Sequence, residues 1–265
     1  DALAQWHQRW FVPGNATLVV AGDVTMAELK TLAERAFGDW SGSKPAAKAI
    51  AAAQSPGTGK VYLIDKPGAP QSLIFAGHVA AQGARPDDLA LETVMRNFGG
   101  MATSRLNRNL RLDKHWSYGT IGSLNGARGP RLFNVIAPVQ TDKTKEAMIE
   151  VKREIEGVAG ARPLAGEELD SILRSQVSRL PGRFETLDSL LLAGLDIVNL
   201  GRDPRYYTDY ARQLRELGGD ALNAAATATV KPDQLTWIVV GDLGLIEAGV
   251  RELGFGEVVR LDQAP

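Results

Sequence analysis

The chain has 265 residues, with 30 Lys and Arg against 31 Asp and Glu, and it contains no cysteine. A net charge of −1 without a Lys/Arg cluster argues against nucleic acid or an anionic membrane as a partner. No run of about 18 apolar residues occurs, so no membrane-spanning helix is predicted. The lack of cysteine excludes disulfides, thiol catalysis and cysteine-bound zinc.

The first part of the chain predicts a helix, a strand and a second helix. Apolar residues at helical spacing indicate that residues 1–10 are helical, and residues 16–21 (ATLVVA) have the composition of a buried strand. Thr25 is followed three residues later by Glu28, the spacing of a capping box, so a helix is expected to begin there. Because the chain begins at Asp1 without Met or a signal-peptide pattern, we expect an excised piece or a processed product.

The rest of the chain alternates between strand and helix patterns. Residues 41–59 have no periodicity and are rich in Ala, Ser, Lys, Gly and Pro, which is typical of a linker. Strands are predicted at residues 60–65, 71–78, 132–139 and 235–240. Helices are predicted at residues 86–98, 105–113, 141–158, 163–180, 184–200, 204–217, 219–229 and 245–253.

One pattern occurs near both ends of the chain. VPGNATLVVAGDV, from Val12, and KPDQLTWIVVGDL, from Lys231, both run Pro, two polar residues, an apolar strand and Gly-Asp. A helix pattern precedes and follows each copy. We interpret this as a repeat of about 220 residues, so the chain would hold the tail of one repeat and nearly all of a second.

The segment from Phe98 to Thr120 carries the most unusual pattern. Gly99-Gly100 predicts a point where the backbone turns without a Cβ penalty. Arg105, Arg108 and Arg111 follow at i, i+3 and i+6, which places them near one face of a helix. Arg105 and Arg108 are expected to serve packing or solvent contact.

Arg111 and Tyr118 are the candidate functional pair in this segment. Arg111 is expected near the helix end and Tyr118 just beyond it, so that both heads can reach one spot. A solvated arginine and a strand tyrosine are the ordinary interpretation. The functional alternative is that guanidinium and phenol, both donors, hold backbone carbonyl oxygens of an extended peptide and stabilise an oxyanion.

Other chemical candidates have structural explanations. His7, His78 and His115 are isolated in sequence, and no H-x-x-E-H or H-E-x-x-H string occurs, so no metal site is predicted. Asp87-Asp88 and Glu167-Glu168 lie at predicted helix N-termini, where acidic side chains favour the helix dipole.

Several linked motifs carry a family resemblance. GGMATSRLNRNLRLDKHWSYG, from Gly99, resembles the G-G…S-R-L…R…Y element of pitrilysin/insulinase-type zinc peptidases and mitochondrial processing peptidase-like proteins. HQRWFVPGNATLVVAGDV, RPDDLALETVMRNFGG, LAGEELDSILRSQV and WIVVGDL resemble other parts of the same family, in order. The resemblance covers nearly the whole chain.

The resemblance implies an α+β fold and half of an active site. In that family two homologous halves, each an antiparallel sheet backed by helices, close around a peptide. The catalytic half carries H-x-x-E-H and zinc, and the other half supplies an Arg and a Tyr that match Arg111 and Tyr118. The motif departs from the family at Leu112, in place of an acidic residue, and at His115-Trp116-Ser117, in place of a Gly-containing run.

The domain organisation follows from the resemblance and the repeat. Residues 1–45 are expected to be the tail of the preceding half, residues 46–59 a linker, and residues 60–265 the second, zinc-less half. The expected partners are a peptide substrate and a zinc-bearing half, on the same polypeptide or in a separate subunit. Zinc is expected in that catalytic half and not in this chain.

These expectations define what the chain does and does not do by itself. We expect a substrate-binding half that does not hydrolyse peptides alone. The alternative is a non-catalytic scaffold subunit of a larger assembly, for which Arg111 and Tyr118 would not be needed. The resemblance favours the bacterial periplasm or another exported compartment.

Overall fold

The computed structural model describes residues 1–46, 51, 53, 59–83, 85–127 and 129–261. Its contacts divide the chain into two compact units: Asp1–Ala51 with Arg179–Thr208, and Ala52–Ser178 with Asp209–Pro265. Most of the predicted linker, residues 46–59, lies outside the described residues, and the predicted domain boundaries stay a prediction. Each unit is described by itself.

The second unit contains a six-stranded sheet in the order β3-β4-β2-β5-β1-β6. The strands are β1 (Lys60–Asp65), β2 (Gln71–Ala80), β3 (Ile121–Leu124), β4 (Arg131–Gln140), β5 (Thr236–Gly241) and β6 (Glu257–Leu261). Four of them confirm the strands that the sequence predicts in this unit. The sequence pattern did not predict β6. For β3 the sequence offers only a strand-like pattern that begins at Trp116, Tyr118 and Ile121, without bounds for a strand.

The sheet is mixed. Antiparallel ladders join β2 to β4, β2 to β5 and β3 to β4, whereas β1 runs parallel to both β5 and β6. Parallel strands need a crossover connection, and helix α11 (Leu243–Glu252) supplies one from β5 to β6, which lie on either side of β1. The α+β class expected from the sequence is confirmed. The expected sheet was antiparallel throughout, whereas the observed sheet also contains the parallel pairs of β1 with β5 and β6.

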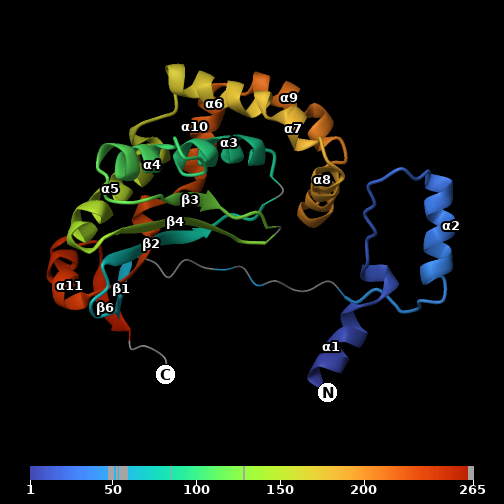
Figure 1. The fold of residues 1–265 in the computed structure, drawn as a ribbon, viewed down its shortest axis with the longest axis horizontal. Helices are drawn as coiled ribbons and strands as arrows, with labels where there is room; N and C mark the ends of the chain where they lie inside the picture. Colours follow the sequence, from blue (N-terminus) through green and yellow to red (C-terminus); the bar gives the residue numbers. More distant parts are fainter. Residues whose placement is uncertain (47–50, 52, 54–58, 84, 128, 262–265) are drawn as a thin grey trace. The chain divides into compact units, whose positions relative to one another are not determined.

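The helices of this unit lie on one side of the sheet (Figure 1). They are α3 (Asp88–Phe98), α4 (Arg105–Asn107), α5 (Thr144–Glu156), α6 (Gly166–Ser178), most of α9 (Tyr206–Glu216), α10 (Gly219–Thr229) and α11. The core lies between the two layers, where Phe98, Phe133, Met148 and Trp237 are fully buried. Side chains at positions i and i+2 of a strand lie on the same face of the sheet, so alternate residues of each strand point into this core.

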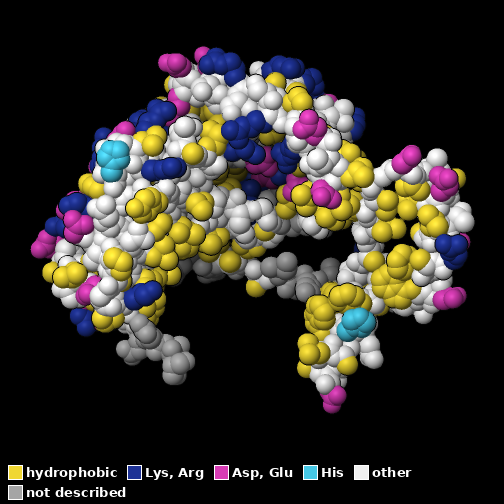
Figure 2. Space-filling view, viewed as in Figure 1, with side chains coloured by type: hydrophobic (Ala, Val, Ile, Leu, Met, Phe, Trp, Pro, Cys, Tyr) yellow, Lys and Arg dark blue, Asp and Glu magenta, His cyan; other side chains and the backbone are white. Residues whose placement is uncertain are grey.

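The first unit is built from short elements with little buried surface. It holds α1 (Ala2–Trp10), a 3₁₀ turn (Pro13–Asn15), α2 (Met26–Phe37), α7 (Leu180–Arg183) and α8 (Leu187–Leu200). The capping box predicted for α2 is confirmed, since Thr25 and Glu28 exchange hydrogen bonds. Hydrophobic side chains gather on the surface of α1 and α2 (Figure 2). They include Leu3, Trp6, Met26, Leu32 and Phe37, all exposed.

The strand predicted at residues 16–21 is wrong for this chain as described. The segment is extended, but it forms no ladder with another described segment, and Leu18 and Val20 are 56% and 43% exposed. A β-strand depends on hydrogen bonds to a neighbour, so a strand-like pattern without a partner gives only an extended backbone. Within this unit α8 comes close, because a Cβ on Gly194 would lie 2.8 Å from Val19 Cγ1.

None of the helices in the described ranges combines the length and the apolar character that crossing a membrane requires.

Candidate functional site

The segment that carries Arg111 and Tyr118 begins where α3 meets β3. The Gly99 carbonyl accepts a hydrogen bond from the Gly122 N–H, and a Cβ on Gly99 would lie 2.2 Å from that nitrogen. Gly99 is therefore required by the close approach of two backbones. This corrects the sequence-based explanation, since neither Gly99 nor Gly100 has a positive φ.

The three arginines do not share one helical face, contrary to the prediction. Arg105 is 9% exposed, whereas Arg108 and Arg111 are exposed. After the single α-turn of α4 the chain continues as a π-helix, Arg108–Asp113, closed by the Lys114 N–H donating to the Asn109 carbonyl at 3.1 Å. A π-turn contains more residues than an α-turn, so the i, i+3, i+6 spacing no longer aligns side chains. Such turns occur frequently at functional sites.

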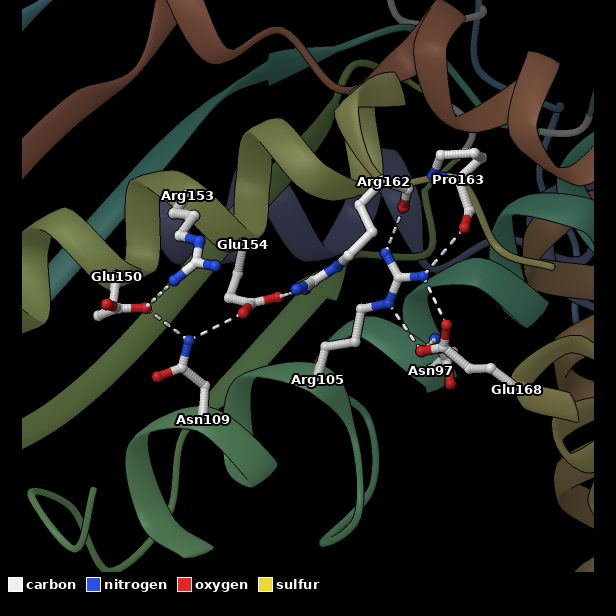
Figure 3. Close-up of polar contacts among 9 residues, drawn as sticks. All are labelled: Asn97, Arg105, Asn109, Glu150, Arg153, Glu154, Arg162, Pro163 and Glu168. Carbon is white, nitrogen blue, oxygen red and sulfur yellow. Dashed lines mark hydrogen bonds and ion pairs between the residues drawn. The ribbon is translucent and has the colours of Figure 1, made fainter. Parts of the chain in front are cut away.

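Arg105 is a structural arginine (Figure 3). Its guanidinium donates to both carboxylate oxygens of Glu168, at 2.7 and 2.6 Å, and to the carbonyl of Arg162 at 2.6 Å. Burial raises the pKa of Glu168, but hydrogen bonds from Arg105 and Asn97 outweigh it, and the pKa is lower than the ordinary value. The predicted packing role of Arg105 agrees with these contacts, which join α4 to the start of α6.

A second polar cluster fixes the π-helix to α5 (Figure 3). The buried Asn109 amide donates to Glu150 at 2.7 Å and to Glu154 at 2.8 Å. Arg162 pairs with Glu154, and Lys114 with Glu150 at 3.6 Å. The backbone that carries Arg111 is thus held to the helical layer by side chains on either side of it.

Asn107 joins the two ends of the segment by hydrogen bonds. Its amide donates to the carbonyls of Met101, at 3.0 Å, and Thr120, at 2.9 Å, and its oxygen accepts the Thr120 N–H at 2.8 Å. All of these bonds are buried or partly buried, where an unpaired polar group would be costly. The sequence analysis missed Asn107, because no local pattern shows that it pairs with a residue thirteen positions later.

The turn between Arg111 and Tyr118 is also held in place by hydrogen bonds of its own backbone and of the Ser117 side chain. The Trp116 N–H donates to the Leu110 carbonyl at 2.9 Å, and the Trp116 carbonyl accepts from the Gln140 N–H at 3.0 Å. Ser117 Oγ accepts from the Gly119 N–H at 3.1 Å and donates to the Gly119 carbonyl at 3.0 Å. The residues that replace a Gly-containing run in the resemblance therefore form a well-bonded turn.

Arg111 and Tyr118 present their heads to solvent from this turn. Tyr118 is 89% exposed and Arg111 is exposed. Neither side chain hydrogen-bonds or pairs with any residue in the described part of the chain. Tyr118 precedes β3 and is not a strand residue. Two unpaired donors on a firmly held backbone are available to bind acceptors such as peptide carbonyl oxygens.

The three histidines lie on separate elements of the described structure. His7 lies on α1, His78 on β2 and His115 in the turn before β3. Among the described residues, no group of three or more His, Asp or Glu side chains lies close enough to hold a metal ion. A catalytic zinc site takes three protein ligands. His78 instead accepts the Lys231 N–H at Nε2, 3.0 Å away, as a buried structural histidine.

The acidic pairs have the structural roles expected of them. Asp88 lies in the first turn of α3 and Glu167 and Glu168 in that of α6. Asp88 also pairs with the buried Arg131 at 2.8 Å.

Comparison with known protein families finds one that matches this chain. The model of the family described as Peptidase M16 inactive domain matches residues 1–175. A sequence comparison with curated proteins finds no significant match.

Three solved structures have a similar fold. A protease from Helicobacter pylori has a TM-score of 0.78 at 18% identity, covering 90% of this chain and 58% of that one. A peptidase M16 inactive domain from Pseudomonas fluorescens has a TM-score of 0.75 at 17% identity, covering 83% and 52%. The first half of the periplasmic protease PqqL from Escherichia coli has a TM-score of 0.71 at 14% identity, covering 98% and 60%. The chain thus spans 52% to 60% of the length of these structures.

Proposed function

Because this chain belongs to the peptidase M16 inactive-domain family, a pitrilysin-type C-terminal, non-catalytic half, we propose that it is the substrate-binding half of a zinc metalloendopeptidase. Its ligand is an extended peptide, and the zinc site is carried by another half, upstream on the same polypeptide or in a separate subunit. The chain alone does not hydrolyse peptides.

The free donors of Arg111 and Tyr118 carry this proposal. Both are exposed, both lack a partner among the described residues, and both project from backbone that is hydrogen-bonded on each side. Arg111 donates to a substrate carbonyl through a planar fork, and Tyr118 donates one O–H. Where that carbonyl is the one under attack, the same donors stabilise the oxyanion that develops on it.

The exposed apolar surface of the first unit supports a neighbouring half. Leu18 and Val20 lie on an unpaired extended segment, and Trp6 and Phe11 are 53% and 52% exposed. Contiguous exposed apolar residues are typical of interaction surfaces. In the proposal, residues 1–45 complete the preceding half, whose sheet pairs with residues 16–21.

The proposed compartment is an exported one. PqqL, a structural neighbour, is a periplasmic protease by its description. Fractionation of cells that produce the full protein tests this part of the proposal, and a protein confined to the cytoplasmic fraction would contradict it.

The decisive experiment supplies the zinc-bearing half. The full protein, or this chain mixed with a zinc-bearing subunit, is assayed on a quenched fluorescent peptide. We expect Arg111→Ala and Tyr118→Phe each to lower kcat/KM by about tenfold to a hundredfold, as the loss of an oxyanion donor does. Arg108→Ala is the matched control, because Arg108 is exposed on the same π-helix, and it should keep the wild-type rate.

Two results would overturn the proposal. Wild-type rates in both variants would remove the pair from substrate binding and leave the scaffold alternative. Zinc binding together with proteolysis by this chain alone would show that the active site is complete without another half.

A further inference from the structure

His115 has an unusual backbone conformation. It is the one non-glycine residue with positive φ, at 57°, among the residues that the structure describes. The left-handed region costs an L-amino acid steric strain, and only a few side chains, His among them, visit it with any frequency. A strained conformation persists only when its surroundings hold it, and such positions cluster at ligand-binding sites.

Two hydrogen bonds hold His115 in that conformation. The ring Nδ1 lies 3.1 Å from the Arg111 carbonyl oxygen, and the His115 carbonyl accepts from Gln140 Nε2 at 3.3 Å. Because a carbonyl oxygen only accepts, Nδ1 is the protonated nitrogen that donates this bond. The ring therefore caps the end of the π-helix at the residue that carries the Arg111 guanidinium.

His115 lies between the two candidate functional residues in the sequence. It lies four residues after Arg111 and three before Tyr118, inside the run where the family resemblance expects a glycine. A glycine reaches positive φ without strain but has no side chain to bond the preceding helix end. His115 supplies both the left-handed turn and a bond back to Arg111.

We propose that His115 is a positioning residue that fixes the relative placement of Arg111 and Tyr118. Its left-handed backbone reverses the chain after the π-helix, and its ring bond holds the Arg111 carbonyl at the start of the turn. Gln140, at the end of β4, holds the other side of the turn. This inference rests on the proposed substrate-binding function of the pair.

Three variants separate the backbone contribution from the ring contribution. His115→Gly keeps the left-handed turn and loses the ring bond. His115→Ala loses the ring bond and retains the strain, whereas His115→Asn tolerates positive φ and keeps a side-chain N–H donor. Gly254→Ala is the control, since Gly254 has φ of 63° with open space around it, remote in sequence from the turn. It measures the cost of an alanine in this conformation elsewhere.

The first measurement is hydrogen exchange of the purified chain at the amides of Lys114 and Trp116. These amides bond to Asn109 and Leu110 across the π-helix end. We expect exchange about fivefold faster in His115→Ala and His115→Gly, as losing one hydrogen bond predicts, and near wild type in His115→Asn and Gly254→Ala. Wild-type exchange in both the Ala and Gly variants would overturn the proposal.

The second measurement is kcat/KM of the complete peptidase. We expect about a tenfold loss in His115→Ala, a smaller loss in His115→Gly and rescue by His115→Asn, because misplaced binding groups cost rate without any lost contact. Unchanged kcat/KM in His115→Ala, with Arg111→Ala and Tyr118→Phe still impaired, would also overturn it. If Arg111→Ala and Tyr118→Phe themselves keep wild-type rates, the proposed function fails, and the exchange data alone decide whether His115 positions the turn.

Discussion

Residues 12–37 and residues 231–252 run through the same series of turn, extended segment, Gly-Asp pair and helix. Each copy begins with a 3₁₀ turn, Pro13–Asn15 in the first and Pro232–Gln234 in the second. The first copy continues into α2 and the second into α11. The local geometry agrees with the repeat inferred from the sequence.

The two copies differ in what surrounds them. In the second copy the extended segment is β5, which lies between β2 and β1, and Trp237 and Val239 are 1% and 0% exposed. The corresponding residues of the first copy are Leu18 and Val20, which are exposed, and α2 buries no residue. The comparison shows that a local pattern determines turns and helix caps, whereas a strand exists only where neighbours supply its ladder.

The largest expected effect comes from an identical substitution in both copies. Val239→Ala should lower the free energy of unfolding by about 2 kcal/mol, because it leaves a cavity among fully buried side chains. Val20→Ala should cost less than about 0.5 kcal/mol in this chain, since the side chain is already exposed. Urea denaturation of the two variants measures the difference.

This pair of variants also tests the role proposed for residues 1–45. In a protein that contains the preceding half, Val20→Ala should become as costly as Val239→Ala. Equal, small costs in both contexts would contradict strand pairing at residues 16–21.

A smaller difference is expected at the aspartates of the two Gly-Asp pairs. Asp242 Oδ2 accepts the Gly68 N–H at 2.8 Å, across the turn that joins β1 to β2. Asp242→Ala should cost about 1 kcal/mol for this bond, and Asp242→Asn should retain most of it. Asp23→Ala should be nearly neutral, because the Asp23 carboxylate has no partner in the described part of the chain. Thermal denaturation of the three variants measures these costs. Equal losses of stability in Asp23→Ala and Asp242→Ala would contradict the expected difference between the two aspartates.

The smallest effect concerns pH and involves His78 on β2, which accepts a hydrogen bond from the N–H of Lys231, the first residue of the second copy. Burial lowers the pKa of His78, the hydrogen bond to the Val79 carbonyl offsets this in part, and the Lys231 charge lowers the pKa further. The unfolded chain, with an ordinary His pKa of about 6.5, therefore binds the proton more readily than the folded protein. The stabilisation from neutral His78 is complete above about pH 6.5 and is lost as the pH falls.

His78→Gln removes this titration. The difference in unfolding free energy between pH 8 and pH 5 should be smaller in the variant than in the wild type. The same substitution at His7, on α1, serves as the control. An unchanged pH dependence in His78→Gln would show that protonation of this ring does not limit stability.

Much of the fold could be predicted from the sequence because its determinants are local. The capping box of Thr25 and Glu28, the strand of residues 60–65 and most of the helices on one side of the sheet were found at or near their observed bounds. β6 was missed because its residues are mostly exposed or half-buried at the sheet edge, so the hydrophobic alternation that marks a strand is weak.

The candidate site was predictable only in part. Arg111 and Tyr118 were chosen from their residue types and from the resemblance, and their role stays a prediction; both side chains are exposed. Three features were not predictable: the π-helix, the hydrogen bonds of Asn107 and the left-handed backbone conformation of His115. Each depends on hydrogen bonds to residues whose positions are set by packing. The Arg105–Glu168 pair joins positions 63 apart, beyond the reach of any local pattern.

The sequence by itself determined the order and type of most of the elements, the pattern shared by residues 12–24 and 231–243, and the residues able to donate to a peptide. Helix propensity, caps and turn residues act over a few positions, so a single sequence reveals them. The tertiary structure decided which arginine is buried, which strand finds a partner and how the turn before Tyr118 is held. Those outcomes depend on burial and on hydrogen bonds between distant segments, whose free energies arise only when the chain is packed.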